Sequence, residues 1–176
     1  MANLKLKNPA GGSLNFVSAD SASDLTVTFP AVTGTAMVSG NMPAFSAYAG
    51  SGTSCANGAQ TKVLFSTELF DTNNNFASST FTPTVAGYYQ FTAGINFSSG
   101  SFIQLTLKRN NVDWQYGSFP NGVSNTNVYV NASFFAYANG TTDYFEIYVY
   151  QASGGTITNN TGQAYTFFTG ALVRAA

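Results

Sequence analysis

Few side chains in this sequence could perform acid–base, nucleophilic or metal chemistry. The chain has no histidine, which removes the commonest general base and metal ligand. Its acidic residues are too scattered to predict the carboxylate pair that glycoside hydrolysis requires. They are Asp20, Asp24, Glu68, Asp71, Asp113, Asp143 and Glu146. No nucleophile–base pair can be proposed either, so the sequence predicts a protein that is not an enzyme and needs no cofactor or catalytic metal.

Asp71 and Cys55 are the two residues that could have a chemical role of their own. Asp71 begins an Asn-rich stretch, 72–75, whose oxygen atoms could hold calcium. The alternative, which we favour, is a turn capped by its own side chains without a metal. Cys55 is the only cysteine, and it has no basic neighbour to activate its thiol. We therefore expect Cys55 to fill space in a loop or strand, and no disulfide within the chain.

Trp114 and Tyr116 follow a polar stretch, 110–113, and could bind sugar. An exposed ring offers a stacking surface for a sugar, and nearby Asn and Asp side chains offer hydrogen bonds. The alternative, which we favour, is that Trp114 closes one end of the fold. Because loops on a rigid β-fold often carry binding residues, we predict recognition surfaces in 111–127 and 151–163. The candidate recognition loop comprises Trp114, Tyr116, Asn121 and Asn125.

Charge is scarce along the whole chain. Charged residues make up 7 % of it and the net charge is −1, against about 25 % charged residues in an average soluble domain. The six Lys and Arg residues form no cluster, so nucleic-acid binding and a polybasic membrane contact are not expected. No apolar run is long enough for a membrane-spanning helix. Weak repulsion between such surfaces favours assembly with copies of the same chain; the alternative is an ordinary surface of solvated Asn, Thr and Ser.

The elements that position these residues are predicted to be strands throughout. A composition with 16 Phe and 10 Tyr suits pleated, half-buried surfaces. Residues 1–41 are predicted to be a short β-rich segment with a turn at 8–12 and a strand at 25–29. Residues 42–176 are predicted to be one domain with turns at 98–100, 110–111 and 139–140. Its expected strands are 44–48, 63–69, 81–82, 87–96, 102–109, 128–138, 143–150 and 165–173. Strands of this length without a helical period predict an all-β sandwich or jelly roll.

Aromatic and glycine landmarks recur in a fixed order from residue 43 to the C-terminus. They are Phe45, Phe65, Asp71, Phe76, Phe81, Gly87, Tyr89, Phe91, Phe168 and Gly170. This set resembles the globular head domain of complement component one q, which shares its jelly roll with tumour necrosis factor. From the residues themselves, Tyr89 and Phe91 belong on one face of a strand, and Gly170 makes room for a ring such as Phe168. Nearly all the landmarks are therefore expected in the core.

The resemblance also implies assembly. Heads of this family pack as homotrimers around an axis at which aromatic residues are buried. The candidates for that axis in this chain are Phe45, Tyr89, Phe145 and Tyr148.

The N-terminal segment is similar to the leader segments of bacteriophage fibre and tail proteins. The similarity is carried by 4–12, 25–30 and 34–40, and it is unlike a collagen stalk. The first residues alternate apolar and polar, which is not a signal peptide, so we expect synthesis in the host cytoplasm and a final place on the virion surface. The resulting hypothesis is a trimeric phage structural protein, either a capsid decoration or head fibre or the head of a tail fibre.

In this hypothesis residues 1–41 attach to a capsid or tail protein, and the head binds a host-surface glycan or protein. The alternative is a secreted ligand or glycan-binding adhesin of cellular origin.

Overall fold

The computed structural model describes residues 3–17, 31, 37, 42–117 and 121–176, and these residues form strands, turns and loops but no helix. The all-β prediction is thereby confirmed. The chain divides into two compact units, Met1–Gly34 and Thr35–Ala176. Met37 belongs with the second unit, because it packs against that unit's core and its Sδ accepts a 3.4 Å hydrogen bond from the Ala175 amide. A functional boundary after residue 41 remains a prediction.

The first unit contains an antiparallel hairpin, β1 (Asn3–Lys7) and β2 (Ser13–Val17). Its turn is stabilised by the side chain of Asn8, whose Oδ1 accepts a 2.6 Å hydrogen bond from the Ala10 amide. Leu4 lies opposite Phe16, and Leu6 lies opposite Leu14. Because side chains alternate along a strand, these four residues form one apolar stripe, and all four are exposed. The predicted strand at 25–29 lies outside the described residues.

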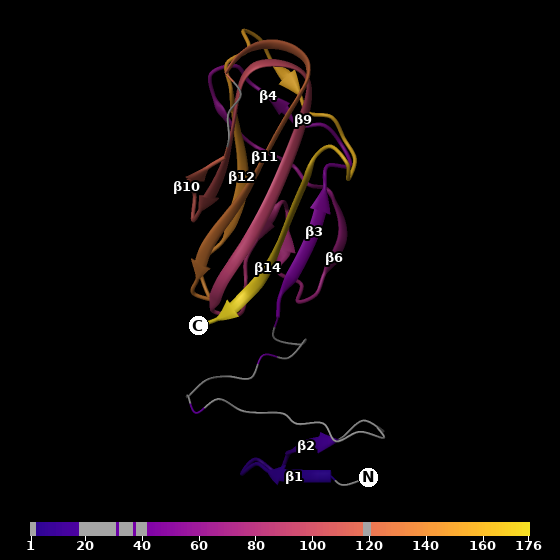
Figure 1. Ribbon diagram of the computed structural model, residues 1–176, viewed down its shortest axis with the longest axis vertical. Coiled ribbons are helices and arrows are strands. Elements are labelled where there is room, and N and C mark those ends of the chain that lie inside the picture. The colour runs from indigo at the N-terminus through magenta and orange to yellow at the C-terminus, as the bar shows by residue number, and fades with distance from the viewer. Residues whose placement is uncertain (1–2, 18–30, 32–36, 38–41, 118–120) are drawn as a thin grey trace. The chain divides into compact units, whose positions relative to one another are not determined.

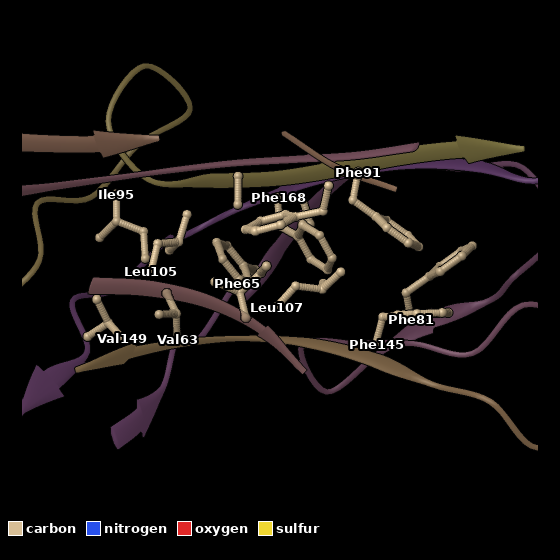
Figure 2. Close-up of a cluster of buried hydrophobic side chains, with 14 of the residues drawn as sticks. Val63, Phe65, Phe81, Phe91, Ile95, Leu105, Leu107, Phe145, Val149 and Phe168 are labelled. Carbon is tan, nitrogen blue, oxygen red and sulfur yellow. The ribbon is translucent and has the colours of Figure 1, made fainter. Parts of the chain in front are cut away.

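The second unit, which we call the head, is a sandwich of two strand layers (Figures 1 and 2). Its strands are β3 (Ala44–Tyr48), β4 (Ser54–Cys55), β5 (Gln60–Lys62), β6 (Thr67–Asp71), β7 (Phe76–Ala77), β8 (Thr80–Phe81), β9 (Gly87–Arg109), β10 (Val112–Tyr116), β11 (Asn121–Ala138), β12 (Phe145–Gln151), β13 (Ile157–Thr158) and β14 (Phe167–Ala175). The long strand β9 belongs to both layers. Its first part pairs with β14 and β11, and its last part pairs with β12 and β10.

We name the two layers by their strands. The front sheet consists of β6, β3, β14, the first part of β9, and β11. The back sheet consists of β10, the last part of β9, and β12, with β5 and β8 beside β12 and β7 beside β8.

Three predicted boundaries are corrected by this topology. Residues 98–100 are not a turn between two strands, because β9 stays paired with β11 there, with Ser99 opposite Thr126 and Gly100 opposite Asn125. The strand predicted at 63–69 begins only at Thr67. Residues 112–116, assigned to a loop, form strand β10 against the end of β9.

The core between the layers is built from stacked aromatic rings (Figure 2). The ring of Phe45 lies 4.4 Å from that of Phe81, 4.8 Å from that of Phe76 and 4.9 Å from that of Phe168, measured between centroids. The landmark rings are all buried, with at most 5 % of any of them exposed: Phe45, Phe65, Phe76, Phe81, Tyr89, Phe91 and Phe168.

The core leaves no room for a side chain at Gly170. A Cβ there would lie 2.5 Å from Cδ1 of Phe91 and 2.8 Å from Cε1 of Phe45. The rings seated over this glycine are therefore those of Phe91 and Phe45 rather than that of Phe168.

Burial excludes three of the four residues expected at a trimer axis. Phe45, Tyr89 and Phe145 have no exposed surface within a single chain, so they cannot contact another copy. Tyr148 is partly exposed on the back sheet, where the Lys108 ammonium lies 4.5 Å from its ring centroid. Three of the four candidates are therefore core residues of the single chain, and Tyr148 stays a predicted contact between copies.

Candidate functional site

The outward side of the front sheet carries little charge over its central strands, where Arg174, exposed near the end of β14 and opposite Tyr88, is the one charged residue. No residue is charged in β3, in β14 up to Ala171, in β9 up to Phe97 or in β11 from Val128 onward. The residues that alternate with the buried ones on these strands are Ser46, Tyr48, Tyr88, Gln90, Thr92, Tyr129, Asn131, Ser133, Phe135, Tyr137, Phe167, Thr169 and Ala171. We call this surface the uncharged face.

An aromatic patch formed by Tyr88, Phe135 and Tyr137 lies at one end of the uncharged face. Tyr88 stacks on Phe135 with centroids 6.1 Å apart and meets Tyr137 edge-on at 5.5 Å. The three residues remain 37–50 % exposed. Clustered exposed rings of this kind are typical of surfaces that bind another protein.

Strand β10 borders this patch. Trp114 Nε1 donates a 3.4 Å hydrogen bond to the Phe135 carbonyl, and the Phe135 amide donates to Gln115 Oε1 at 3.1 Å. A shallow hollow of about 290 Å³ beside the patch is lined by Gln90, Gln115, Ser133, Phe134 and Phe135. The patch is thus continuous with polar groups that can bind a partner's main chain or side chains.

Apart from Glu68 and Asp71 on edge strand β6 and Arg174 on β14, the charged residues of the two sheets lie on the back sheet. The three ion pairs of the described residues all involve the back sheet or the turn before β12: Lys62–Glu146 at 2.7 Å, Lys108–Asp113 at 3.2 Å and Arg109–Asp143 at 2.7 Å. The back sheet therefore carries partly buried ion pairs, whereas the central part of the front sheet presents rings, hydroxyls and amides.

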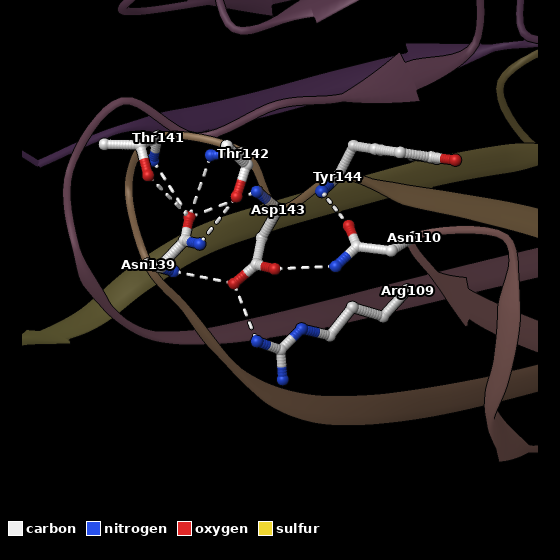
Figure 3. A network of polar contacts seen from close by, with 7 residues as sticks. All are labelled: Arg109, Asn110, Asn139, Thr141, Thr142, Asp143 and Tyr144. Atoms are coloured by element: carbon white, nitrogen blue, oxygen red, sulfur yellow. Dashed lines mark hydrogen bonds and ion pairs between the residues drawn. The ribbon is translucent and has the colours of Figure 1, made fainter.

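Asp143 is the best-connected of these charged groups (Figure 3). Its carboxylate accepts hydrogen bonds of 2.7 Å from Arg109 and from Asn110 Nδ2, and one of 2.8 Å from the Asn139 amide. Burial by itself raises the pKa of Asp143, but these three donors and the Arg109 charge outweigh it, so the pKa lies below its usual value. This network holds the 139–144 turn against the end of β9, which is a structural role.

We expect Asp143→Asn to remove a pH-dependent part of the head's stability. Since the folded pKa is depressed, the stabilisation is complete above the ordinary carboxyl pKa and is lost as the pH falls through the lower folded value. The variant should lose about 1.5–3 kcal/mol at pH 7, and the difference in Tm from wild type should shrink towards about pH 2. Thermal unfolding across this range measures both effects. Glu68→Gln, at an exposed carboxylate on β6, is the control, and a pH-independent difference for Asp143→Asn would contradict the assignment.

The candidate recognition loop does not come together as one loop. Trp114 and Tyr116 lie on β10, where the Arg109 guanidinium sits 5.2 Å from the Trp114 ring and the Tyr116 hydroxyl donates to Asp113 at 2.9 Å. Asn121 and Asn125 belong to β11, and their side chains are outside the described part. Sequence reasoning missed Tyr88, Phe135 and Tyr137, although their alternation with buried neighbours was a usable signal.

The remaining candidates from the sequence, Asp71 and Cys55, have surroundings that indicate a structural role. Asp71 accepts hydrogen bonds from the amides of Asn73 at 3.3 Å and Phe76 at 2.7 Å, the geometry of a turn capped by its own side chain. In the described residues no cluster of three possible metal ligands occurs. Cys55 is fully buried, and burial raises the pKa of its thiol to about 11. No described helix is long and apolar enough to cross a membrane.

Comparison with solved structures identifies the fold. The globular domain of the zebrafish complement 1qA protein matches 76 % of this chain and 98 % of its own, with a TM-score of 0.60 and 19 % identity. Murine APRIL, in a crystal structure at pH 5.0, matches 75 % and 99 %, with a TM-score of 0.60 and 9 % identity. Eiger TNF from S. frugiperda matches 77 % and 93 %, with a TM-score of 0.59 and 10 % identity. No protein-family model and no curated protein sequence matches the chain. At these identities the likeness establishes the jelly roll of complement and tumour-necrosis-factor heads and nothing finer.

Proposed function

We propose that this chain is a non-catalytic virion surface protein of a bacteriophage, a homotrimer that attaches by its N-terminal segment and displays the jelly-roll head to the host surface. On the particle it serves as a capsid decoration, a head fibre or the head of a tail fibre. In this proposal the head forms the trimer and binds the host surface. The N-terminal segment determines what the protein is attached to.

The observation that best supports a trimer is the uncharged face. A front sheet with half-exposed Tyr88, Phe135 and Tyr137, and with Arg174 as the one charged residue on its central strands, has the composition of a protein interface. The back sheet instead carries most of the charged side chains of the head, held in ion pairs. Burying the uncharged face against copies of the same chain removes apolar area from water, and Arg174, opposite Tyr88, is the one charge on these strands that would need a partner.

The apolar stripe of the N-terminal hairpin supports attachment. Leu4, Leu6, Leu14 and Phe16 are 44–61 % exposed on one side of two strands. A two-stranded hairpin is marginally stable by itself, so a capsid or tail protein that covers this stripe would stabilise it. The phage setting is further supported by the similarity of 4–12, 25–30 and 34–40 to leader segments of fibre and tail proteins.

A second candidate is a secreted ligand or glycan-binding adhesin of cellular origin. It is favoured by the compared structures, which come from zebrafish, mouse and S. frugiperda. Its hairpin stripe would then be covered by the rest of its own assembly rather than by a virion protein.

The test is to add labelled purified protein separately to host cells and to capsids that lack it. We expect capsid binding that Leu6→Lys abolishes and that Asn15→Lys, on the polar side of the hairpin, leaves intact. Binding to capsids alone rejects the adhesin role, and binding to cells alone rejects the decoration role. Binding to neither, by a trimeric protein, rejects the virion proposal in favour of a cellular ligand.

A further inference from the structure

A polar hollow of about 500 Å³ lies where the loop between β13 and β14 meets β9 and β11. It is lined by Asn96, Ser98, Asn127, Asn160, Thr161 and Tyr165. None of these residues is charged. The volume falls within the range of about 300–1,000 Å³ that is usual for small-molecule sites. Along β9 the hollow is roughly 26 Å from Tyr88, at about 3.3 Å of rise per residue, so it is separate from the aromatic patch.

The amides of the hollow are held in one arrangement by hydrogen bonds to each other. Asn96 is 3 % exposed, and its Nδ2 donates to Asn127 Oδ1 at 2.7 Å. Its Oδ1 accepts a hydrogen bond from Asn160 Nδ2. The Ser98 hydroxyl donates to Asn160 Oδ1 at 2.9 Å. Three amides and a hydroxyl from three separate chain segments therefore present fixed donors and acceptors at one surface.

The backbone that carries Asn160 is also fixed. Its amide donates to the Asn96 carbonyl at 2.8 Å, and its carbonyl accepts from the Thr166 hydroxyl at 2.7 Å and from Asn159 Nδ2 at 2.9 Å. Asn159 and Thr166 are buried. A polar ligand would meet groups that need little further ordering, which lowers the cost of binding.

Tyr165 supplies the apolar part of the hollow. It is 50 % exposed, and its backbone is anchored by a 3.0 Å hydrogen bond from its amide to the Gly162 carbonyl. A half-exposed ring beside oriented amides matches the two sides of a pyranose, whose axial hydrogens stack on a ring while its hydroxyls both donate and accept hydrogen bonds. The lack of any lining charge disfavours anionic ligands, which recruit Arg or Lys.

We propose that this hollow binds a neutral saccharide, with Tyr165 as the stacking ring and Ser98, Asn127 and Asn160 as the groups that hydrogen-bond its hydroxyls. The assignment rests on the proposed function, since it names the site and the ligand class by which the displayed head engages a host-surface glycan. It differs from the sugar platform of Trp114 and Tyr116 that the sequence offered as one alternative, because Trp114 packs against Arg109 and the Tyr116 hydroxyl donates to Asp113.

Saturation-transfer NMR on the full-length protein tests the site, with the methyl glycosides of glucose, galactose, mannose and N-acetylglucosamine as probes and N-acetylneuraminic acid as the anionic comparison. We expect transfer to at least one neutral probe. Tyr165→Ala should weaken its binding by about tenfold or more, whereas Tyr165→Phe should retain it. Thr161→Phe, which fills the hollow from an exposed position, should abolish it. Tyr116→Ala, at a similarly exposed ring, is the control and should leave binding unchanged.

Three results would overturn the assignment: no transfer to any neutral probe, transfer confined to N-acetylneuraminic acid, or binding that survives Thr161→Phe and a folded Tyr165→Ala. Loss of binding in Tyr116→Ala alone would move the site to β10 and also overturn it. Sedimentation of the same samples separates this inference from the proposed function. A trimer that binds no neutral sugar rejects only the saccharide site, and a monomer that binds one rejects only the assembly.

Discussion

Phe135→Glu is expected to convert the assembled protein into single chains of 18.5 kDa. Phe135 is 50 % exposed in the aromatic patch, where it stacks on Tyr88. Within one chain the substitution loses a ring contact worth about 0.5–1.5 kcal/mol and leaves the new carboxylate in water. In a trimer each chain would bury an unpaired carboxylate, at a cost of about 3–5 kcal/mol for each, which is more than a hundredfold in affinity for each contact.

Sedimentation equilibrium at micromolar concentration measures this effect. Val112→Glu is the matched control, because Val112 is 68 % exposed at the start of β10 and lies off the uncharged face. The control should remain trimeric, and both variants should keep the thermal unfolding of a folded head. A wild-type protein that sediments as a monomer would reject the assembly proposal, and a trimeric Phe135→Glu would place the interface elsewhere.

Phe45→Ala is expected to cost about 3–5 kcal/mol of unfolding free energy. Phe45 has no exposed surface, and its ring stacks on Phe81 and Phe76 and meets Phe168 edge-on. Removing it leaves a cavity between rings that belong to both layers and cannot close over it, because protein interiors are close-packed. The Tm should fall by roughly 6–20 °C for a chain of this size.

Thermal or denaturant unfolding at a fixed chain concentration measures this loss, since association adds to apparent stability. Phe70→Ala is the control, because Phe70 lies on edge strand β6 and is 50 % exposed. Its expected cost is within about 0.5 kcal/mol. A cost below about 1 kcal/mol for Phe45→Ala would show that the ring stack is not the centre of the core.

Much of the fold could be predicted because the information is local. Alternation of apolar and polar residues defines strands such as β3 and β11, and Gly- and Asn-rich stretches such as 110–111 and 139–140 mark their ends. At Asn110 and Asn111 the backbone takes φ values of 54° and 64°, which asparagine tolerates better than most residues. The order of aromatic landmarks from Phe45 to Phe168 then predicted a jelly roll, which the solved complement and tumour-necrosis-factor heads confirm.

The strand content, the aromatic composition of the core and the scarcity of charge therefore follow from local patterns and composition. Which of the outward aromatic residues meet in one patch depends instead on the pairing of the strands. Tyr88 and Tyr89 are neighbours of identical chemistry, yet Tyr88 is 40 % exposed and Tyr89 is fully buried. A shift of one residue in register exchanges the two faces of a strand, and register depends on pairing with β11 and β14. The proposed saccharide site also depends on the tertiary structure. Asn96, Asn127 and Asn160 meet only after β9, β11 and the loop before β14 have packed together.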